Sequence, residues 1–291
     1  MRAFASVGLL VLSVLGLAQP ISSSMPADAV LVGAGDIASC ESAGDEMTAK
    51  LLDSIAGTVF TAGDNVYERG RLQEFTRCFA PSWGRHKARM RPSPGNHDYL
   101  TKDGQGYFKY FGAAAGPPSK GYYAYNLGVW RVIVLNSNCA HVGGCHNGSP
   151  QERWLRAELN AHSALCTLAY WHHPRFSSGP HGDALSVGSF WDALYEAGAE
   201  LIVNGHDHLY ERFAPQAPDG SLNSDRGIRQ FTVGTGGRSL YSVKRLTRNS
   251  VFRSATTFGV LKLTLRASGY IWQFVAAPSG KVLDKGESLC Y

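Results

Sequence analysis

TVFTAGDNVY, residues 58–67, carries the strongest fold signal in this sequence. Its first half, Thr58–Ala62, is a short apolar run, which predicts a buried strand. Gly63 then lets the backbone turn sharply, and Asp64 and Tyr67 follow at once. Because sites in open α/β sheets gather at the carboxyl ends of strands, this segment predicts a strand that ends in a functional loop.

The same order, an apolar run followed by metal-ligand residue types, recurs at four other places. They are Gly35-Asp36, Gly95-Asn96-His97-Asp98, His172-His173-Pro174 and Gly205-His206-Asp207-His208. One such segment is a weak sign, because a Gly-Asp pair is usually a turn and a lone histidine is usually an ordinary surface or core residue. Five together predict a site for Fe, Mn or Zn, because burying so many ionisable groups is costly unless metal ions neutralise them.

Strands and helices alternate over the first two thirds of the chain, and strands dominate the last third. Helices are predicted over residues 45–55, after a capping box at residues 149–152, and over residues 190–197, where Gly198 ends the helix. Strands are predicted at residues 29–33, 58–62, 122–127, 129–135, 167–171, 201–203, 230–233, 259–265 and 270–276. This order favours an α/β (α+β) fold with a mixed sheet, or with two sheets packed together.

The motifs resemble those of the calcineurin-like metallophosphoesterases, and most closely the purple acid phosphatase branch. GDNVY at residues 63–67 is similar to that branch's GDxxY, and GNHD at 95–98 to its GNH(D/E). GHDHLYER at 205–212 and GTGG at 234–237 are similar to its C-terminal signatures. Many other members carry Asp-x-His at the first motif, where this chain has Ala38, and Tyr67 is the ligand that replaces it. The resemblance implies a four-layer αββα sandwich of two mixed β-sheets flanked by helices, formed by residues 25–291.

The resemblance also implies two metal ions. The first ion would be held by Asp36, Asp64, Tyr67 and His208, with Asp64 bridging, and the second site would be completed by Asn96, His172 and His206. A phenolate ligand implies Fe(III) at the first site, while Fe(II), Zn or Mn would occupy the second. His172 is chosen over His173 because the family's ligand stands two residues before this proline.

The implied reaction is hydrolysis of phosphomonoesters, in which a hydroxide formed at the two cations attacks phosphorus. His97 is the candidate acid for the leaving group, oriented by Asp98, and its alternative role is a brace for Asn96. Asn96, His97 and His173 are the candidate substrate-binding residues, with a structural role as the alternative for His173. Three further histidines lie in loops and are expected at the surface: His141, His146 and His181.

Other functions stay open at this point. A phosphodiesterase or nucleotidase would use the same metals. A non-catalytic metal-binding or adhesive protein would be marked by lost ligands, and none is missing. An iron redox protein is the third possibility, and phosphatase activity that survives exchange of Fe(II) for Zn would argue against it.

The composition is that of a globular protein. The 291 residues are 44% hydrophobic and 18% charged, which excludes a disordered chain or a coiled coil. Lys and Arg number 28 against 23 Asp and Glu, for a net charge of +5. This small, dispersed excess suits a small phosphorylated substrate and falls short of a nucleic-acid-binding signature, so no nucleic acid is expected as a stable partner. The oligomeric state is left open.

Residues 1–24 are typical of an export signal, because Arg2 precedes an apolar run at residues 7–17 that is too short to span a bilayer. A retained anchor is the alternative. No other stretch is predicted to cross a membrane, so a secreted or periplasmic location is expected, without membrane attachment after removal of the signal. Six cysteines in an exported chain suggest disulfides rather than a thiolate metal site. Cys139–Cys145 is the first expected pair because it encloses a short glycine loop, followed by Cys40–Cys78 and Cys166–Cys290.

Overall fold

The apolar run that precedes Asp64 forms an inner strand of a six-stranded sheet in the computed structural model, which describes residues 1, 3–5, 8, 27–162 and 164–291. The sheet order is β13-β12-β11-β1-β2-β3. β1 (Ala29–Ala34), β2 (Thr58–Ala62) and β3 (Met90–Ser93) are parallel. The antiparallel strands β11 (Gly259–Arg266), β12 (Gly269–Ala276) and β13 (Val282–Leu289) complete the sheet.

The second sheet has seven strands in the order β10-β8-β9-β7-β6-β5-β4. Its parallel centre consists of β5 (Trp130–Val134), β6 (Cys166–Tyr170), β7 (Leu201–Asn204) and β9 (Arg229–Val233). The antiparallel strands are β4 (Tyr123–Leu127), β8 (Tyr210–Phe213) and β10 (Ser250–Ser254). Both sheets are therefore mixed, as expected.

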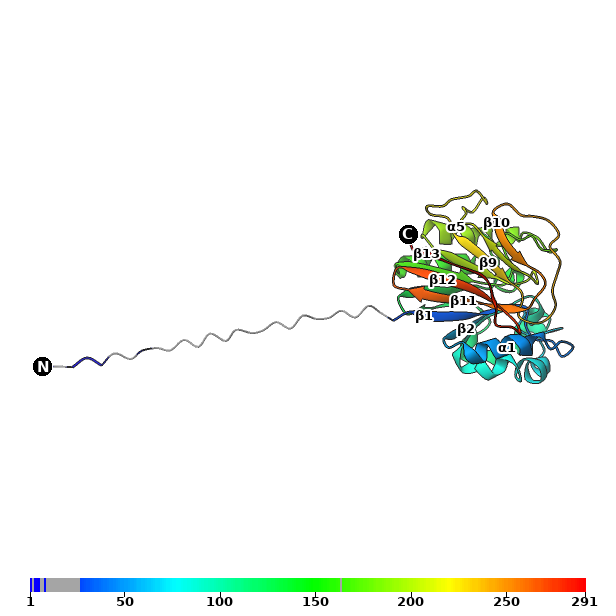
Figure 1. Ribbon diagram of the computed structural model, residues 1–291, viewed down its shortest axis with the longest axis horizontal. Coiled ribbons are helices and arrows are strands. Elements are labelled where there is room, and N and C mark those ends of the chain that lie inside the picture. The colour runs from blue at the N-terminus through cyan, green and yellow to red at the C-terminus, as the bar shows by residue number, and fades with distance from the viewer. Residues whose placement is uncertain (2, 6–7, 9–26, 163) are drawn as a thin grey trace.

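Helices cover the outer faces of the two sheets (Figure 1). α1 (Gly44–Ser54) packs Ala49 and Leu52 into the core of the first sheet. The same side carries α2 (Leu72–Glu74) and α3 (Gln105–Phe111). α4 (Pro150–Ala161) and α5 (Gly188–Glu196) cover the second sheet. Shorter helical segments are η1 (Phe75–Phe79), η2 (Trp83–Arg89), η3 (His97–Tyr99), η4 (Lys102–Gly104), η5 (Gly112–Ala115), η6 (Cys139–His141) and η7 (Leu185–Val187).

The inner faces of the two sheets meet in a core of aromatic side chains. Phe60 of β2 lies against Tyr170 of β6, with 5.5 Å between ring centroids. Tyr210 of β8 stacks on Phe274 of β12 at 4.0 Å. Such pairs join the sheets directly, so the chain forms the expected four layers of helix, sheet, sheet and helix.

The helix α4 begins as its sequence predicts, with one difference in its cap. The Ser149 hydroxyl accepts the N–H of Glu152 at 3.4 Å. In a standard capping box the Glu152 carboxylate would accept the N–H of Ser149, but here it accepts the N–H of Gly148 at 2.9 Å. The reciprocal bond is therefore displaced by one residue toward the preceding loop.

Four strands were not expected from the sequence: β3, β8, β10 and β13. Three of them are sheet edges, where apolar patterning is weakest. β3 carries Pro92, which an edge strand tolerates. β13 carries Asp284, which is buried and accepts hydrogen bonds from Tyr210 and Arg212, each at 2.7 Å. That buried carboxylate makes the strand look like a polar loop in the sequence.

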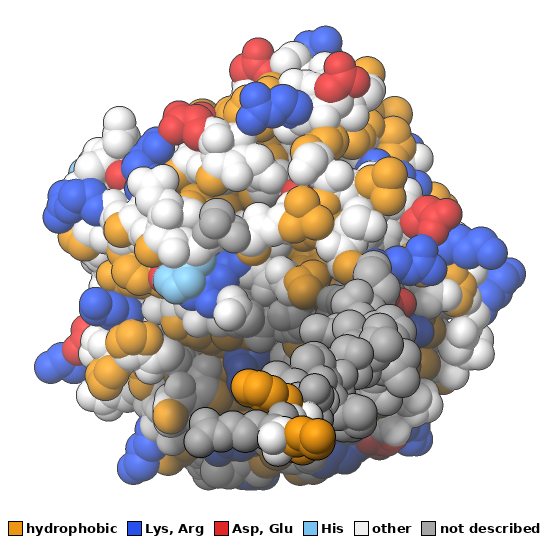
Figure 2. All heavy atoms as spheres, turned by 90° about the vertical axis from the view of Figure 1, so that its left-hand side faces the viewer, with side chains coloured by type: hydrophobic (Ala, Val, Ile, Leu, Met, Phe, Trp, Pro, Cys, Tyr) orange, Lys and Arg blue, Asp and Glu red, His pale blue; other side chains and the backbone are white. Residues whose placement is uncertain are grey.

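All three expected disulfides are confirmed: Cys40–Cys78, Cys139–Cys145 and Cys166–Cys290. The predicted export signal, residues 1–24, falls largely outside the described residues. Among the residues that are described, no helix has the length and apolar character needed to cross a membrane. On the face seen in Figure 2, lysine and arginine side chains are scattered among acidic and apolar ones rather than gathered in one stripe.

Candidate binuclear metal centre

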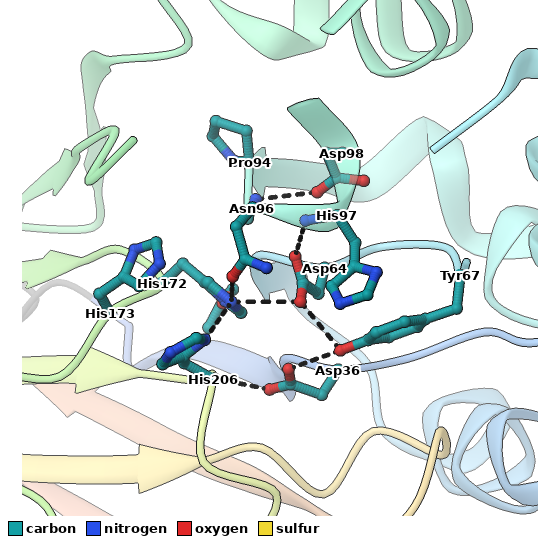
Figure 3. Close-up of polar contacts among 12 residues, drawn as sticks. Asp36, Asp64, Tyr67, Pro94, Asn96, His97, Asp98, His172, His173 and His206 are labelled. Atoms are coloured by element: carbon teal, nitrogen blue, oxygen red, sulfur yellow. Dashed lines mark hydrogen bonds and ion pairs between the residues drawn. The ribbon is translucent and has the colours of Figure 1, made fainter. Parts of the chain in front are cut away.

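The five sequence segments meet at the carboxyl ends of parallel strands from both sheets. Asp36, Asp64 and Asn96 follow β1, β2 and β3 of the first sheet. His172 follows β6 of the second sheet, and His206 and His208 follow β7. Figure 3 shows the labelled ligand candidates pointing toward a common centre from these different strands. The stacking of two sheets thus brings together residues far apart in sequence.

Tyr67 marks the first of two groups of donor atoms. Its hydroxyl oxygen lies 2.8 Å from Asp36 Oδ1, 2.9 Å from Asp64 Oδ2 and 3.2 Å from His208 Nε2. His208 Nε2 is in turn 3.3 Å from Asp36 Oδ1. Four potential ligand atoms, three oxygens and one nitrogen, therefore enclose one small space.

His172 marks the second group. Its Nε2 lies 3.1 Å from Asn96 Oδ1, 3.2 Å from His206 Nδ1 and 3.3 Å from Asp64 Oδ2. The same oxygen of Asp64 thus belongs to both groups, as a bridging carboxylate would. The three residues Asp36, Asp64 and His172 also form one of the Asp/His clusters that suit a metal ion.

These spacings fit metal coordination. Ligand atoms about 2.1 Å from one ion stand about 3.0 Å apart at neighbouring octahedral positions and about 3.4 Å apart in a tetrahedron. The measured separations in both groups, 2.8 to 3.3 Å, fall in this range. Asp36 and Asp64 are 0% and 2% exposed, so their charges need a positive partner. The donor set therefore fits two cations.

The atoms that face away from the centre are fixed by other hydrogen bonds. His172 Nδ1 donates to the carbonyl of Ala62 at 2.8 Å, which leaves Nε2 free as a ligand. His208 Nδ1 bonds the Ser239 hydroxyl at 2.8 Å. The outer oxygen of Asp36 accepts the N–H of His206 at 2.8 Å. Each side chain therefore presents one defined atom to the centre.

Glycines permit this close approach. A Cβ on Gly95 would lie 2.1 Å from Asp64 Oδ1, and one on Gly63 would lie 2.5 Å from His172 Nδ1. A Cβ on Gly205 would lie 2.8 Å from Asp36 Oδ2. The glycine in each of these motifs leaves room for a ligand that comes from another strand.

The electrostatics of the site also favour bound cations. Burial raises the pKa of Tyr67 well above 10, and the charges of Asp36 and Asp64 raise it further. The phenolate form of Tyr67 therefore requires a strong positive charge beside it. Burial, the largest single influence, disfavours the charged form of Asp64, but His172, His97 and His206 together lower the pKa of the Asp64 carboxyl.

His97 lies at the rim of the site, and its orientation differs from the sequence prediction. Its Nδ1 lies 2.6 Å from the carbonyl oxygen of Glu68, and its ring packs against Tyr67 with 4.3 Å between centroids. The Asp98 carboxylate, expected to orient His97, is fully buried and instead accepts N–H groups from Asn65 and Gly95, each at 2.9 Å. The prediction for Asp98 is thus corrected, because adjacent residues in the tight turn η3 project in different directions.

His173 stands beside the second donor group. Its Nδ1 bonds the Ser137 hydroxyl at 2.8 Å, and its ring centroid is 4.4 Å from that of His206. Burial, followed by the charge of His172, lowers the pKa of His173 to about 3. His173 is therefore a neutral imidazole next to the donor atoms of His172 and His206.

Three residues near the centre carry no strong signal in the sequence. His181 is exposed, as expected, but its ring lies 4.2 Å from that of His206. Tyr241 stacks on His208 with 3.9 Å between centroids, nearly parallel at 6°. Arg238 lies over the ring of Tyr67 at 5.3 Å. In the sequence, Arg238 and Tyr241 are connected to the site only by their position shortly after the GTGG motif.

Two donor groups that share a carboxylate, set at the strand ends of two stacked mixed sheets, define a metallophosphoesterase. The chain belongs to the family described as Calcineurin-like phosphoesterase, which it matches over residues 26–210. A binuclear metal site is typical of this family.

Two curated proteins are similar to parts of this chain. An uncharacterized protein of Mycobacterium tuberculosis (strain ATCC 25618 / H37Rv) is 27% identical over 186 residues, 51% of this chain and 35% of the relative. Purple acid phosphatase 15 of Arabidopsis thaliana is 29% identical over 104 residues, 34% of this chain and 19% of that protein. The chain thus spans about a third or less of the length of these curated relatives.

Solved structures share the fold. Purple acid phosphatase PPD1 from yellow lupin (Lupinus luteus) seeds superposes with a TM-score of 0.74 at 17% identity, covering 90% of this chain and 54% of that one. GAP50 of Plasmodium, described as the anchor in the inner membrane complex, gives 0.67 at 16% identity, with 91% and 89% coverage.

Proposed function

We propose that this protein is an exported binuclear metallophosphatase that hydrolyses phosphomonoesters. The observation that carries the proposal is the pair of donor groups sharing Asp64 Oδ2, in which the distances from Tyr67 Oη and His172 Nε2 to the other donor atoms are 2.8 to 3.3 Å. Asp36, Asp64, Tyr67 and His208 hold the first ion, and Asp64, Asn96, His172 and His206 hold the second. The phenol oxygen of Tyr67 favours Fe(III) at the first position, and Fe(II), Zn or Mn suits the second.

When bound, the two cations supply an activated water nucleophile and neutralise charge on the phosphoryl oxygens. The side chains of the protein position the substrate and transfer the proton to the leaving group. Asn96 and His173 line the side of the second donor group, where a phosphoryl oxygen would be held by the amide and the neutral imidazole.

His97 is the proposed acid for the leaving group. Its Nδ1 is occupied by the Glu68 carbonyl, so Nε2 remains to donate a proton. His97→Ala should slow esters with poor leaving groups by about 10²–10⁴-fold, the usual range for general acid catalysis, and affect activated aryl esters much less. His141→Ala is the matched control, because His141 stacks on Tyr99 instead. Equal losses on both substrate types would assign His97 to bracing Asn96.

The overall activity is tested with parallel substrates. Purified, metal-loaded protein should hydrolyse p-nitrophenyl phosphate faster than bis-p-nitrophenyl phosphate. The reverse preference would favour a phosphodiesterase with the same centre. Metal analysis should find two ions per chain and a violet band that Tyr67→Phe abolishes. A protein that binds neither ion, or hydrolyses neither ester with both ions bound, would refute the proposal.

An extracytoplasmic location is part of the proposal. Three disulfides support it, since such bonds persist in oxidising compartments. Fractionation of the host cell should recover the protein outside the cytoplasm without residues 1–24. Recovery in the cytoplasm with reduced cysteines would contradict this.

A further inference from the structure

Arg238 is anchored beside the ligands proposed for the first metal ion. Its backbone N–H donates to the carbonyl of Asp36 at 3.0 Å. The preceding glycines are tied to the same region: the N–H of Gly236 donates to the carbonyl of Gly35 at 2.9 Å, and the Ser42 hydroxyl donates to the carbonyl of Gly237 at 2.7 Å. The start of the Arg238 side chain is therefore held in a fixed position next to the end of β1.

The guanidinium of Arg238 lies over the ring of Tyr67. Its Cζ is 5.3 Å from the ring centroid, within the range of a cation–π contact. The other end of the guanidinium pairs with the Glu68 carboxylate. The proposed ligand Tyr67 therefore lies under the Arg238 guanidinium, and its chain neighbour Glu68 carries the opposite charge of the ion pair.

The charges of this pair act on Tyr67 in opposite directions. A positive charge over the ring stabilises negative charge on a phenolate, and the Glu68 carboxylate opposes this effect. Arg238 is 26% exposed and Glu68 51%, so solvent screens the carboxylate more than the guanidinium. The net effect of the pair favours the phenolate.

We propose that Arg238 is a positioning residue that acts on Tyr67. The charge of Arg238, held over the phenol ring by Glu68, stabilises the phenolate and thereby raises the energy of charge transfer from Tyr67 to a bound Fe(III). The inference rests on the proposed function for the identity of the first metal ion. It assigns a role to a side chain outside both donor groups.

The test is the visible spectrum of iron-loaded protein with metal content measured on the same samples. Arg238→Met removes the positive charge, so the violet band should move to longer wavelength. Glu68→Gln removes the opposing negative charge and should move the band to shorter wavelength. Arg238→Lys keeps the charge and should stay close to the parent. Arg245→Met is the matched control, because Arg245 pairs with Asp183 and is 57% exposed.

Opposite shifts in the two variants distinguish an electrostatic role from a purely structural one. If the two substitutions only loosened Tyr67, the band would move in the same direction in Arg238→Met and Glu68→Gln. That result overturns the inference, and so does a band that does not move at full iron content. Absence of any violet band in iron-loaded parent protein also overturns it. Turnover of p-nitrophenyl phosphate on the same samples reports separately on the proposed function, because hydrolysis with an unmoved band leaves that function standing.

Discussion

Single atoms determine how the candidate centre is built. For His172, the carbonyl of Ala62 takes Nδ1, so only Nε2 faces the other donors. For Asp64, one oxygen accepts the N–H of His97 at 2.8 Å while the other joins both donor groups. Outer contacts of this kind fix ligand orientation, so their loss should weaken metal binding even when every ligand is retained.

Gly95 offers the sharpest test of this close packing. Gly95→Ala would place a methyl group 2.1 Å from Asp64 Oδ1 and 2.2 Å from the Asp64 nitrogen, so Asp64 must shift. We expect metal affinity to fall about 10–100-fold, as when outer contacts are lost, with a parallel loss of phosphatase activity. The measurement is metal retained after dialysis. Gly188→Ala is the control, since its nearest neighbour is 4.0 Å away. Unchanged metal retention in Gly95→Ala would contradict the prediction.

We expect Glu200 to make the free energy of unfolding depend on pH. Glu200 is 2% exposed, one carboxylate oxygen accepts the Thr167 N–H at 2.6 Å, and the other has no hydrogen-bond partner among the described residues. Burial raises the pKa of Glu200 to about 7 from 4.5. Between pH 4.5 and about pH 7, the folded state therefore keeps a proton on Glu200 that the unfolded state has released. The free energy of unfolding should fall by about 3 kcal/mol as the pH rises through this range.

The check for Glu200 is urea unfolding across this pH range. Glu200→Gln stays neutral and should lose this contribution to the pH slope. Glu196→Gln, at an exposed position on α5, should retain it. Identical slopes in the parent and Glu200→Gln would show that folding does not raise the pKa of Glu200.

At the scale of elements, the parallel strands position the site and the helices cover the outer faces of the sheets. β1, β2 and β3 all end at the same edge of the first sheet, and β6 and β7 end at the matching edge of the second. α4 then covers the second sheet and packs against α5. The beginning of α4 depends on one hydroxyl group, which can be tested by itself.

Ser149→Ala removes the acceptor for the Glu152 N–H at the start of α4. Because Ser149 is 1% exposed, water does not easily replace the lost bond. The free energy of unfolding should fall by about 1 kcal/mol. Ser54→Ala, at the exposed end of α1, should change it little. The two variants are compared by urea denaturation, and equal stabilities would argue that the displaced Glu152–Gly148 bond alone caps the helix.

Across the whole molecule, the disulfides differ in how much of the chain they restrain. Cys166–Cys290 links residues 124 apart, from the start of β6 to the C-terminal end, whereas Cys139–Cys145 links residues 6 apart. Chain-entropy arguments give about 5 kcal/mol for the long loop and about 2 kcal/mol for the short one. Replacing both cysteines of each pair by alanine should therefore destabilise the protein more for Cys166–Cys290. A larger loss for the short loop would show that local strain or packing dominates.

Much of this fold was predictable because its signals are local. Apolar runs such as β2 and β7 form buried strands, and the glycine after each run marks the turn. The edge strands β3 and β13 were missed because Pro92 and Asp284 break the apolar pattern. The buried Asp284 carboxylate is satisfied by hydrogen bonds from Tyr210 and Arg212, which belong to the opposite sheet.

The amino-acid sequence alone indicated the candidate ligands and the strands before Asp36, Asp64, His172 and His206, because strand patterning and glycine turns act over a few residues, whereas β3 before Asn96 was not indicated. Tertiary structure decided which nitrogen of each histidine faces the centre. It also decided that His97 bonds the carbonyl of Glu68 rather than the expected Asp98. The same holds for Arg238 over Tyr67. These features depend on two sheets packing face to face, which brings together atoms that no local pattern relates.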